Sequence, residues 1–137
     1  MKRLLIMIIV TMLILPSVVL AEDELRPYTE HNLPCTILGA DFDYGGEGVA
    51  FSALSGARHG MYNYRDDAEL DFYADNDVTM GCSAGAWTKY TINAAKGGVY
   101  RVYVGYATPQ GGNVNITIDN TVKLYGDLKA TGGWQDI

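Results

Sequence analysis

The chain has 137 residues, including 16 glycines and 10 tyrosines, and carries a formal net charge of -6. This length and composition suit one globular, β-rich domain and exclude a disordered tail or a coiled coil. The acidic balance argues against nucleic acid and anionic membranes as partners, because both attract positively charged proteins.

A targeting segment opens the chain. Lys2 and Arg3 precede an apolar run that is followed by Pro16 and by a small residue, Ala21. This order is typical of a secretory signal peptide cleaved after Ala21, and an uncleaved anchor is the alternative. We expect a secreted, periplasmic or cell-surface protein that has no membrane contact after cleavage. Its predicted parts are a signal peptide (1–21), a polar leader (22–32) and one domain (33–137).

The two cysteines, Cys35 and Cys82, would enter an oxidising compartment on export. A disulfide can persist there, and we expect one because each cysteine lies beside a predicted strand at the same end of the fold. Two free, buried thiols are the alternative. The pattern gives no support for a zinc site or a thioredoxin-like site, because the C-x-x-C spacing is absent.

The most informative stretch is residues 33–51, LPCTILGADFDYGGEGVAF. It predicts a strand, an acidic and aromatic loop rich in glycine, and a second strand. Glycine suits such a reversal because it adopts positive φ without steric cost.

Further strands are predicted at residues 68–73, 87–92, 99–106 and 113–119. In the last of these, Val114, Ile116 and Ile118 alternate with polar residues, which is the period of a half-buried strand. Asp119 and Asn120 then form a two-residue link suited to a tight hairpin turn. Because no helical spacing follows the signal peptide, the pattern predicts an all-β sandwich or barrel.

Four segments in the same order resemble the family 6 carbohydrate-binding modules, which are galactose-binding-like β-sandwiches of jelly-roll type. Beside residues 33–51, these segments are AGAWTKYTINAAKGGVYRVYVGYA, NVNITIDNTVK and TGGWQDI. The resemblance covers the chain from Leu33 onward. It implies a non-catalytic module of a secreted protein that binds a plant or algal polysaccharide.

The resemblance also implies a sugar-binding cleft among the loops. Tyr64 and Trp134 would clamp a sugar ring, because flat aromatic faces suit the apolar surface of sugars. Glu47 would accept hydrogen bonds from sugar hydroxyls, and Arg65 would order the cleft.

The residues themselves leave plainer alternatives open. Tyr64 could be a packed strand residue and Glu47 a solvated turn residue, whereas Arg65 could pair with neighbouring aspartates. Trp134 could belong to the core, although Gly132 and Gly133 before it favour exposure. Trp87, which opens an alternating strand, is expected in the core.

Acidic residues are frequent between positions 66 and 77. A glycosidase needs two carboxyl groups opposed across a cleft, which proximity in sequence does not supply. We therefore expect a solvated face and no enzymatic activity.

No cofactor is expected. Members of the resembled family usually hold a structural calcium, but Leu38 and Ala40 stand where the family has glutamates. Calcium needs several oxygen ligands, so we expect this site to be lost.

In the family, closing strands follow the Trp-Gln segment, so the resemblance implies that this chain stops inside a strand. Two alternatives to a binding module remain. One is the leading piece of a larger glycoside hydrolase encoded downstream, and the other is an adhesin-like structural sandwich that binds no sugar.

Overall fold

The computed structural model describes residues 24–53, 64–68, 70–74 and 78–134. The predicted signal peptide (1–21) lies outside these ranges. The chain divides into two compact units, which we call unit 1 (Met1–Gly97) and unit 2 (Gly98–Ile137). Each unit is described separately below.

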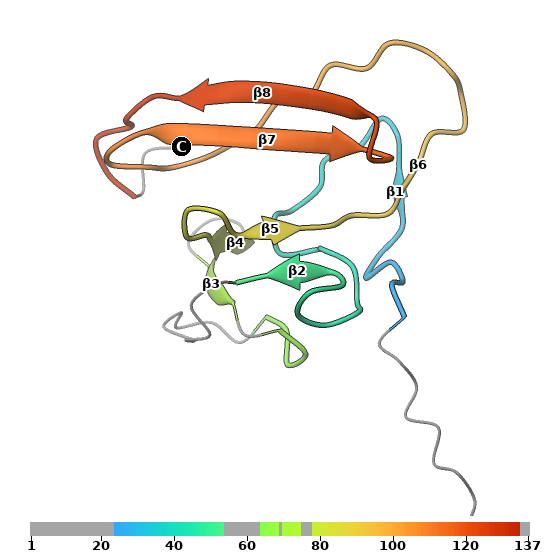
Figure 1. Ribbon diagram of the computed structural model, residues 1–137, viewed down its shortest axis with the longest axis horizontal. Coiled ribbons are helices and arrows are strands. Elements are labelled where there is room, and N and C mark those ends of the chain that lie inside the picture. Colours follow the sequence, from blue (N-terminus) through green and yellow to red (C-terminus); the bar gives the residue numbers. More distant parts are fainter. Residues whose placement is uncertain (1–23, 54–63, 69, 75–77, 135–137) are drawn as a thin grey trace, which may run out of the picture. The chain divides into compact units, whose positions relative to one another are not determined.

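The described residues form eight strands and no helix (Figure 1), so the prediction of an all-β fold is confirmed. The sandwich itself stays a prediction, because the strands form four separate two-stranded ladders. The strands are β1 (His31–Asn32), β2 (Phe51–Ser52), β3 (Asp71–Ala74), β4 (Val78–Gly81), β5 (Trp87–Thr88), β6 (Ile92–Asn93), β7 (Gly112–Ile118) and β8 (Val122–Leu128).

Unit 1 contains three short ladders. β1 pairs with β6 in parallel, whereas β2 pairs with β5 and β3 with β4 in antiparallel orientation. The first strand predicted within residues 33–51 is wrong, because residues 36–38 form no ladder in the structure. The Leu33 N–H donates to the Asn93 carbonyl at 2.9 Å and so extends the β1–β6 ladder. Pro34 follows and has no N–H with which to continue it.

The core of unit 1 is built on three phenylalanines, Phe42, Phe51 and Phe72. The ring centroids of Phe42 and Phe51 lie 5.2 Å apart, and those of Phe42 and Phe72 lie 6.4 Å apart. Small or branched apolar side chains complete the buried cluster: Ala40, Ala50, Ala53, Ala68 and Leu70. This core draws together the loop before β2, β2 itself and β3.

The polar leader, which the sequence left without a structural role, is tied to unit 1. Arg26 and Tyr44 exchange two backbone hydrogen bonds, of 3.2 and 2.8 Å. The Arg26 guanidinium carbon also lies 3.9 Å from the centre of the Tyr44 ring. His31 in β1 is buried. Residues 26–32 therefore belong to the packed structure.

Unit 2 is dominated by one long antiparallel hairpin of β7 and β8, in which Asn115 pairs with Tyr125 (Figure 1). Asp119 and Asn120 form its turn at positive φ, 48° and 56°, and the Thr121 N–H donates to the Ile118 carbonyl at 3.0 Å. Asp and Asn tolerate this left-handed region better than other residues with a β-carbon. The predicted turn is confirmed.

The predicted strand at residues 99–106 is wrong, because this segment forms no ladder. Within the described chain this segment pairs with no strand, and Val99 is 99% exposed. Val102 and Val104 nevertheless line one groove together with the hairpin residue Val114. The alternation of apolar residues thus identifies the side chains that face the hairpin. It does not show that a second strand lies beside this segment, which a ladder requires.

Candidate functional site

Arg65 lies at the centre of an aromatic cluster in unit 1. Its side chain is almost fully buried, and its guanidinium carbon lies 4.0 Å from the ring centre of Phe42, 4.4 Å from that of Tyr28 and 5.0 Å from that of Tyr44. Desolvated cation–π contacts of this kind stabilise by about 2 kcal/mol or more. Tyr28 comes from the leader, so Arg65 joins the leader to the core.

The N–H groups of the Arg65 guanidinium also donate hydrogen bonds. They bind the Phe42 carbonyl and the carboxylate of Asp67, the Nε donating to Oδ1 at 2.9 Å and Nη2 to Oδ2 at 2.5 Å. The hydrogen bond from Arg65 holds the pKa of Asp67 below its ordinary range. Pairing with a nearby aspartate, the plainer alternative for Arg65, is therefore confirmed. A buried guanidinium can order a site by positioning its neighbours.

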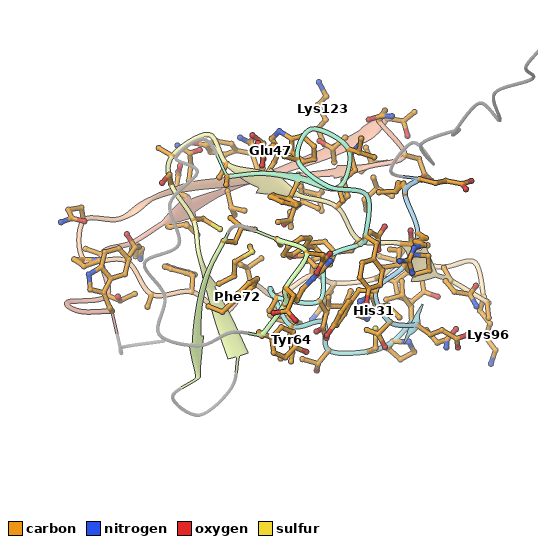
Figure 2. All side chains as sticks on the ribbon, turned by 90° about the horizontal axis from the view of Figure 1, so that it is seen from below. His31, Glu47, Tyr64, Phe72, Lys96 and Lys123 are labelled. Atoms are coloured by element: carbon orange, nitrogen blue, oxygen red, sulfur yellow. The ribbon has the colours of Figure 1, made fainter. Side chains whose placement is uncertain are left out.

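Tyr64 precedes Arg65 and is half-buried against the core. Its ring centroid lies 5.9 Å from that of Phe72 and 6.0 Å from that of Tyr28. Its hydroxyl donates to the Asp41 carboxylate at 2.7 Å. This hydrogen bond, with burial as the second cause, raises the pKa of Tyr64. The hydroxyl proton is thus already engaged, and we expect a sugar to meet chiefly the exposed part of the ring of Tyr64, which is labelled in Figure 2.

Asp41 was not singled out from the sequence as a site residue. It lies in the acidic and aromatic loop, 23 residues before its partner Tyr64. Nothing local in the sequence indicates a contact over that separation.

Glu47 holds the loop that leads into β2. One carboxylate oxygen accepts from the Ser52 hydroxyl at 2.7 Å, and the other accepts from the Ala53 N–H at 3.1 Å. Gly46 and Gly48 flank it at φ values of 73° and 84°. In Figure 2, Glu47 and Tyr64 lie on separate sides of unit 1. The structure thus does not bring these two predicted site residues together.

Trp134 belongs to unit 2 and is exposed, as Gly132 and Gly133 led us to expect; 71% of its surface is accessible. The turn before it is anchored by Thr131, whose N–H donates to the Thr108 carbonyl at 2.9 Å and whose hydroxyl donates to the Gly133 carbonyl at 2.8 Å. Gly132 takes a φ of 91°. Because Tyr64 lies in unit 1, the pairing of Tyr64 with Trp134 stays a prediction.

Trp87 was expected in the core, but the structure places it outside the core. It is 38% exposed, and the Lys89 Nζ lies 5.1 Å from the centre of its ring. It pairs with Ser52 of β2. The alternating pattern predicted that Trp87 would be buried. Its ring instead lies beside the ammonium group of Lys89 and is not part of the phenylalanine core.

The two cysteines are exposed free thiols in the structure. The alternative of two buried thiols is wrong for Cys35, which is exposed. At Cys82, partial burial of the thiol raises its pKa. Their pairing after export stays a prediction.

The residues at the family's calcium position do not fit a calcium ion. Ala40 is fully buried and, like Leu38, offers no side-chain oxygen. The carboxylate of Asp43 accepts from Thr91, through its N–H at 2.9 Å and its hydroxyl at 2.6 Å. Among the residues that can be described, no group of three or more potential metal ligands occurs.

Comparison with known proteins identifies the family. The family model "Carbohydrate binding module (family 6)" matches residues 58–136, which is more than half of the chain. No curated protein and no solved structure matches. Within the described residues, no helix is long and apolar enough to cross a membrane. The match covers the region of the last three resembling segments and does not include residues 33–51, and the chain belongs to the family 6 carbohydrate-binding modules.

Proposed function

We propose that this chain is a secreted, non-catalytic module that binds plant or algal polysaccharide, with the indole of Trp134 as its principal sugar contact. The observation that carries the proposal is the 71% exposure of Trp134 on an anchored turn. A large aromatic face in water is unfavourable unless a ligand covers it, and the apolar face of a sugar ring is a suitable cover.

Tyr64 is proposed as a weaker contact, because its hydroxyl is bound to Asp41 and its ring is half-buried. Arg65 is proposed as a positioning residue, which fixes the neighbouring Tyr64 through the aromatic cluster. Glu47 can meet a sugar hydroxyl only through the acceptor capacity that Ser52 and Ala53 leave on its carboxylate.

The proposal of a non-catalytic role is supported by how the carboxylates of the Asp41–Glu47 loop are used. Asp41 accepts from Tyr64, Asp43 accepts from Thr91, and Glu47 accepts from Ser52. A glycosidase needs one carboxyl free to act as an acid and a second free to act as a base or nucleophile. We infer that a glycoside hydrolase, encoded with this module or acting beside it, would supply the chemistry.

The test is native electrophoresis of the mature chain in gels that contain soluble xylan, β-glucan or agarose fragments. We expect one polysaccharide to retard the band, with micromolar or weaker affinity. Trp134→Ala should weaken binding about tenfold or more, which corresponds to about 1.4 kcal/mol. Tyr64→Ala should weaken it less.

The matched control is Trp87→Ala, which removes an indole of lower exposure from unit 1 and should leave retardation unchanged. Retardation that survives Trp134→Ala would contradict the assignment of Trp134. A sharp band that no polysaccharide retards would favour the structural, non-binding alternative.

A further inference from the structure

The polar leader is held against unit 1 on both sides of Tyr28. Before Tyr28 in the chain, Arg26 and Tyr44 exchange the two backbone hydrogen bonds described above. After it, the buried His31 donates from Nε2 to the Asp41 carbonyl at 3.4 Å. The backbone that carries Tyr28 is therefore attached to the packed structure at two points.

The side chain of Tyr28 is also fixed, because its ring packs against a buried cation. The guanidinium carbon of Arg65 lies 4.4 Å from the ring centre of Tyr28, and Arg65 is itself bound to Asp67. The ring centroid of Tyr28 lies 5.3 Å from that of Tyr44 and 6.0 Å from that of Tyr64. Contacts between aromatic rings, and between a cation and a ring, stabilise particular orientations. Tyr28 thus connects the fixed guanidinium to the ring of Tyr64.

The side chain of Tyr64 has neighbours from three parts of unit 1. Phe72 of β3 and Tyr28 of the leader contact its ring, at interplanar angles of 54° and 51°. Asp41 accepts the hydrogen bond from its hydroxyl. Asp41 raises the pKa of Tyr64 more than Tyr28 does, so the hydroxyl is held chiefly by Asp41. The contribution of Tyr28 is therefore mainly a contact between rings.

We propose that Tyr28 is a positioning residue of the binding site, which holds the ring of Tyr64 in the orientation in which that ring meets a sugar. This inference rests on the proposed role of Tyr64 as a sugar contact, and it extends the site to the leader. A side chain that is ordered before binding loses less conformational entropy when a ligand covers it. Residues before Leu33, where the resemblance to the family begins, thereby contribute to sugar binding.

The test measures the dissociation constant of the mature chain for the polysaccharide that retards it, by native electrophoresis at a series of polysaccharide concentrations. Tyr28→Leu keeps an apolar side chain but removes the ring, and should raise the dissociation constant about threefold, because the sugar must then order the Tyr64 ring itself. Tyr28→Phe keeps the ring and should restore the original value. In a Tyr64→Ala background, Tyr28→Leu should have no further effect, because the ring that Tyr28 positions is gone.

The matched control is Tyr44→Leu, the same substitution in the same aromatic cluster. The ring of Tyr44 contacts Tyr28 and Arg65, whereas Tyr28 also contacts Tyr64. Tyr44→Leu keeps the backbone hydrogen bonds to Arg26 and should leave the dissociation constant unchanged.

Three results would overturn the positioning role alone: an unchanged affinity in Tyr28→Leu, an equal loss in Tyr44→Leu, or a loss in Tyr28→Leu that persists in the Tyr64→Ala background. The last two would show that the cluster acts through the stability of unit 1 and not through the Tyr64 ring. If no polysaccharide retarded the unmodified chain, the proposed function itself would fail, and the positioning role with it.

Discussion

The two units of this chain use different interactions. In unit 1 the ladders are short, two to four residues per strand, and side chains such as Phe42 and Arg65 provide the buried contacts. In unit 2 the strands β7 and β8 are seven residues long each, whereas Val122 and Leu124 on them are 49% and 41% exposed. Unit 1 is therefore specified by side-chain packing, and unit 2 by backbone pairing.

The largest effect is expected for Arg65→Met, which keeps an apolar side chain at this position and removes the buried guanidinium of unit 1. The Phe42 carbonyl would lose its partner while buried, so we expect a loss of about 2–4 kcal/mol in the free energy of unfolding. Urea denaturation measures it. Arg101→Met, the same change at an exposed arginine of unit 2, should cost less than about 0.5 kcal/mol. Equal effects would refute the central role of Arg65.

In unit 2, a smaller effect on stability is expected from substitutions in the turn of the β7–β8 hairpin. Asn120 sits at a φ of 56°, where glycine is less strained and alanine more strained. Asn120→Gly should stabilise the hairpin by about 0.5 kcal/mol, and Asn120→Ala should destabilise it by about 0.5–1 kcal/mol. Amide hydrogen exchange at Ile116 and Leu124 measures the effect. Opposite signs of change would contradict the assigned turn.

A smaller effect is expected in acid. The folded-state pKa of Asp67 is lowered below its ordinary value of 3.8 by Arg65, so the pair stabilises unit 1 above that pH. This contribution is lost as pH falls through the folded-state pKa. Because Asp67 is 37% exposed, solvent screens the pair and we expect less than about 1 kcal/mol. Urea midpoints between about pH 6 and pH 3 should fall less steeply for Asp67→Asn. If the urea midpoints of the two proteins depended on pH to the same extent, the Arg65–Asp67 pair would not stabilise unit 1.

The smallest expected effect is that of calcium on thermal unfolding. Leu38 and Ala40 supply no side-chain oxygen, and the Asp43 carboxylate is bound to Thr91. We therefore expect the same melting temperature in the presence of excess calcium or a chelator. A rise with calcium would show that other residues of the chain form a site.

The predictable parts of the fold are those set by neighbours in sequence. The β7–β8 hairpin follows from the alternation of Val114, Ile116 and Ile118 and from the Asp119-Asn120 turn, because both are local patterns. The exposure of Trp134 likewise follows from the two glycines before it. The all-β class follows from the absence of helical spacing after Ala21.

The parts that sequence did not predict depend on long-range contacts. Arg65 meets Phe42 from 23 residues away, and Tyr64 meets Asp41 over the same separation. No periodic pattern encodes such a contact. Trp87 and residues 99–106 show a second limit. Alternation identifies apolar side chains, but it does not say whether they lie in a core or whether their backbone pairs in a ladder.

The most direct test of Trp134 as the sugar contact uses the fact that the chain has only two tryptophans. In Trp87→Phe, all tryptophan emission comes from Trp134, and titration with the polysaccharide that retards the protein should give a saturable blue shift. In the mirror variant, Trp134→Phe, the remaining emission should not change. An unchanged Trp134 emission under conditions of full retardation, or a shift confined to Trp87, would contradict the account.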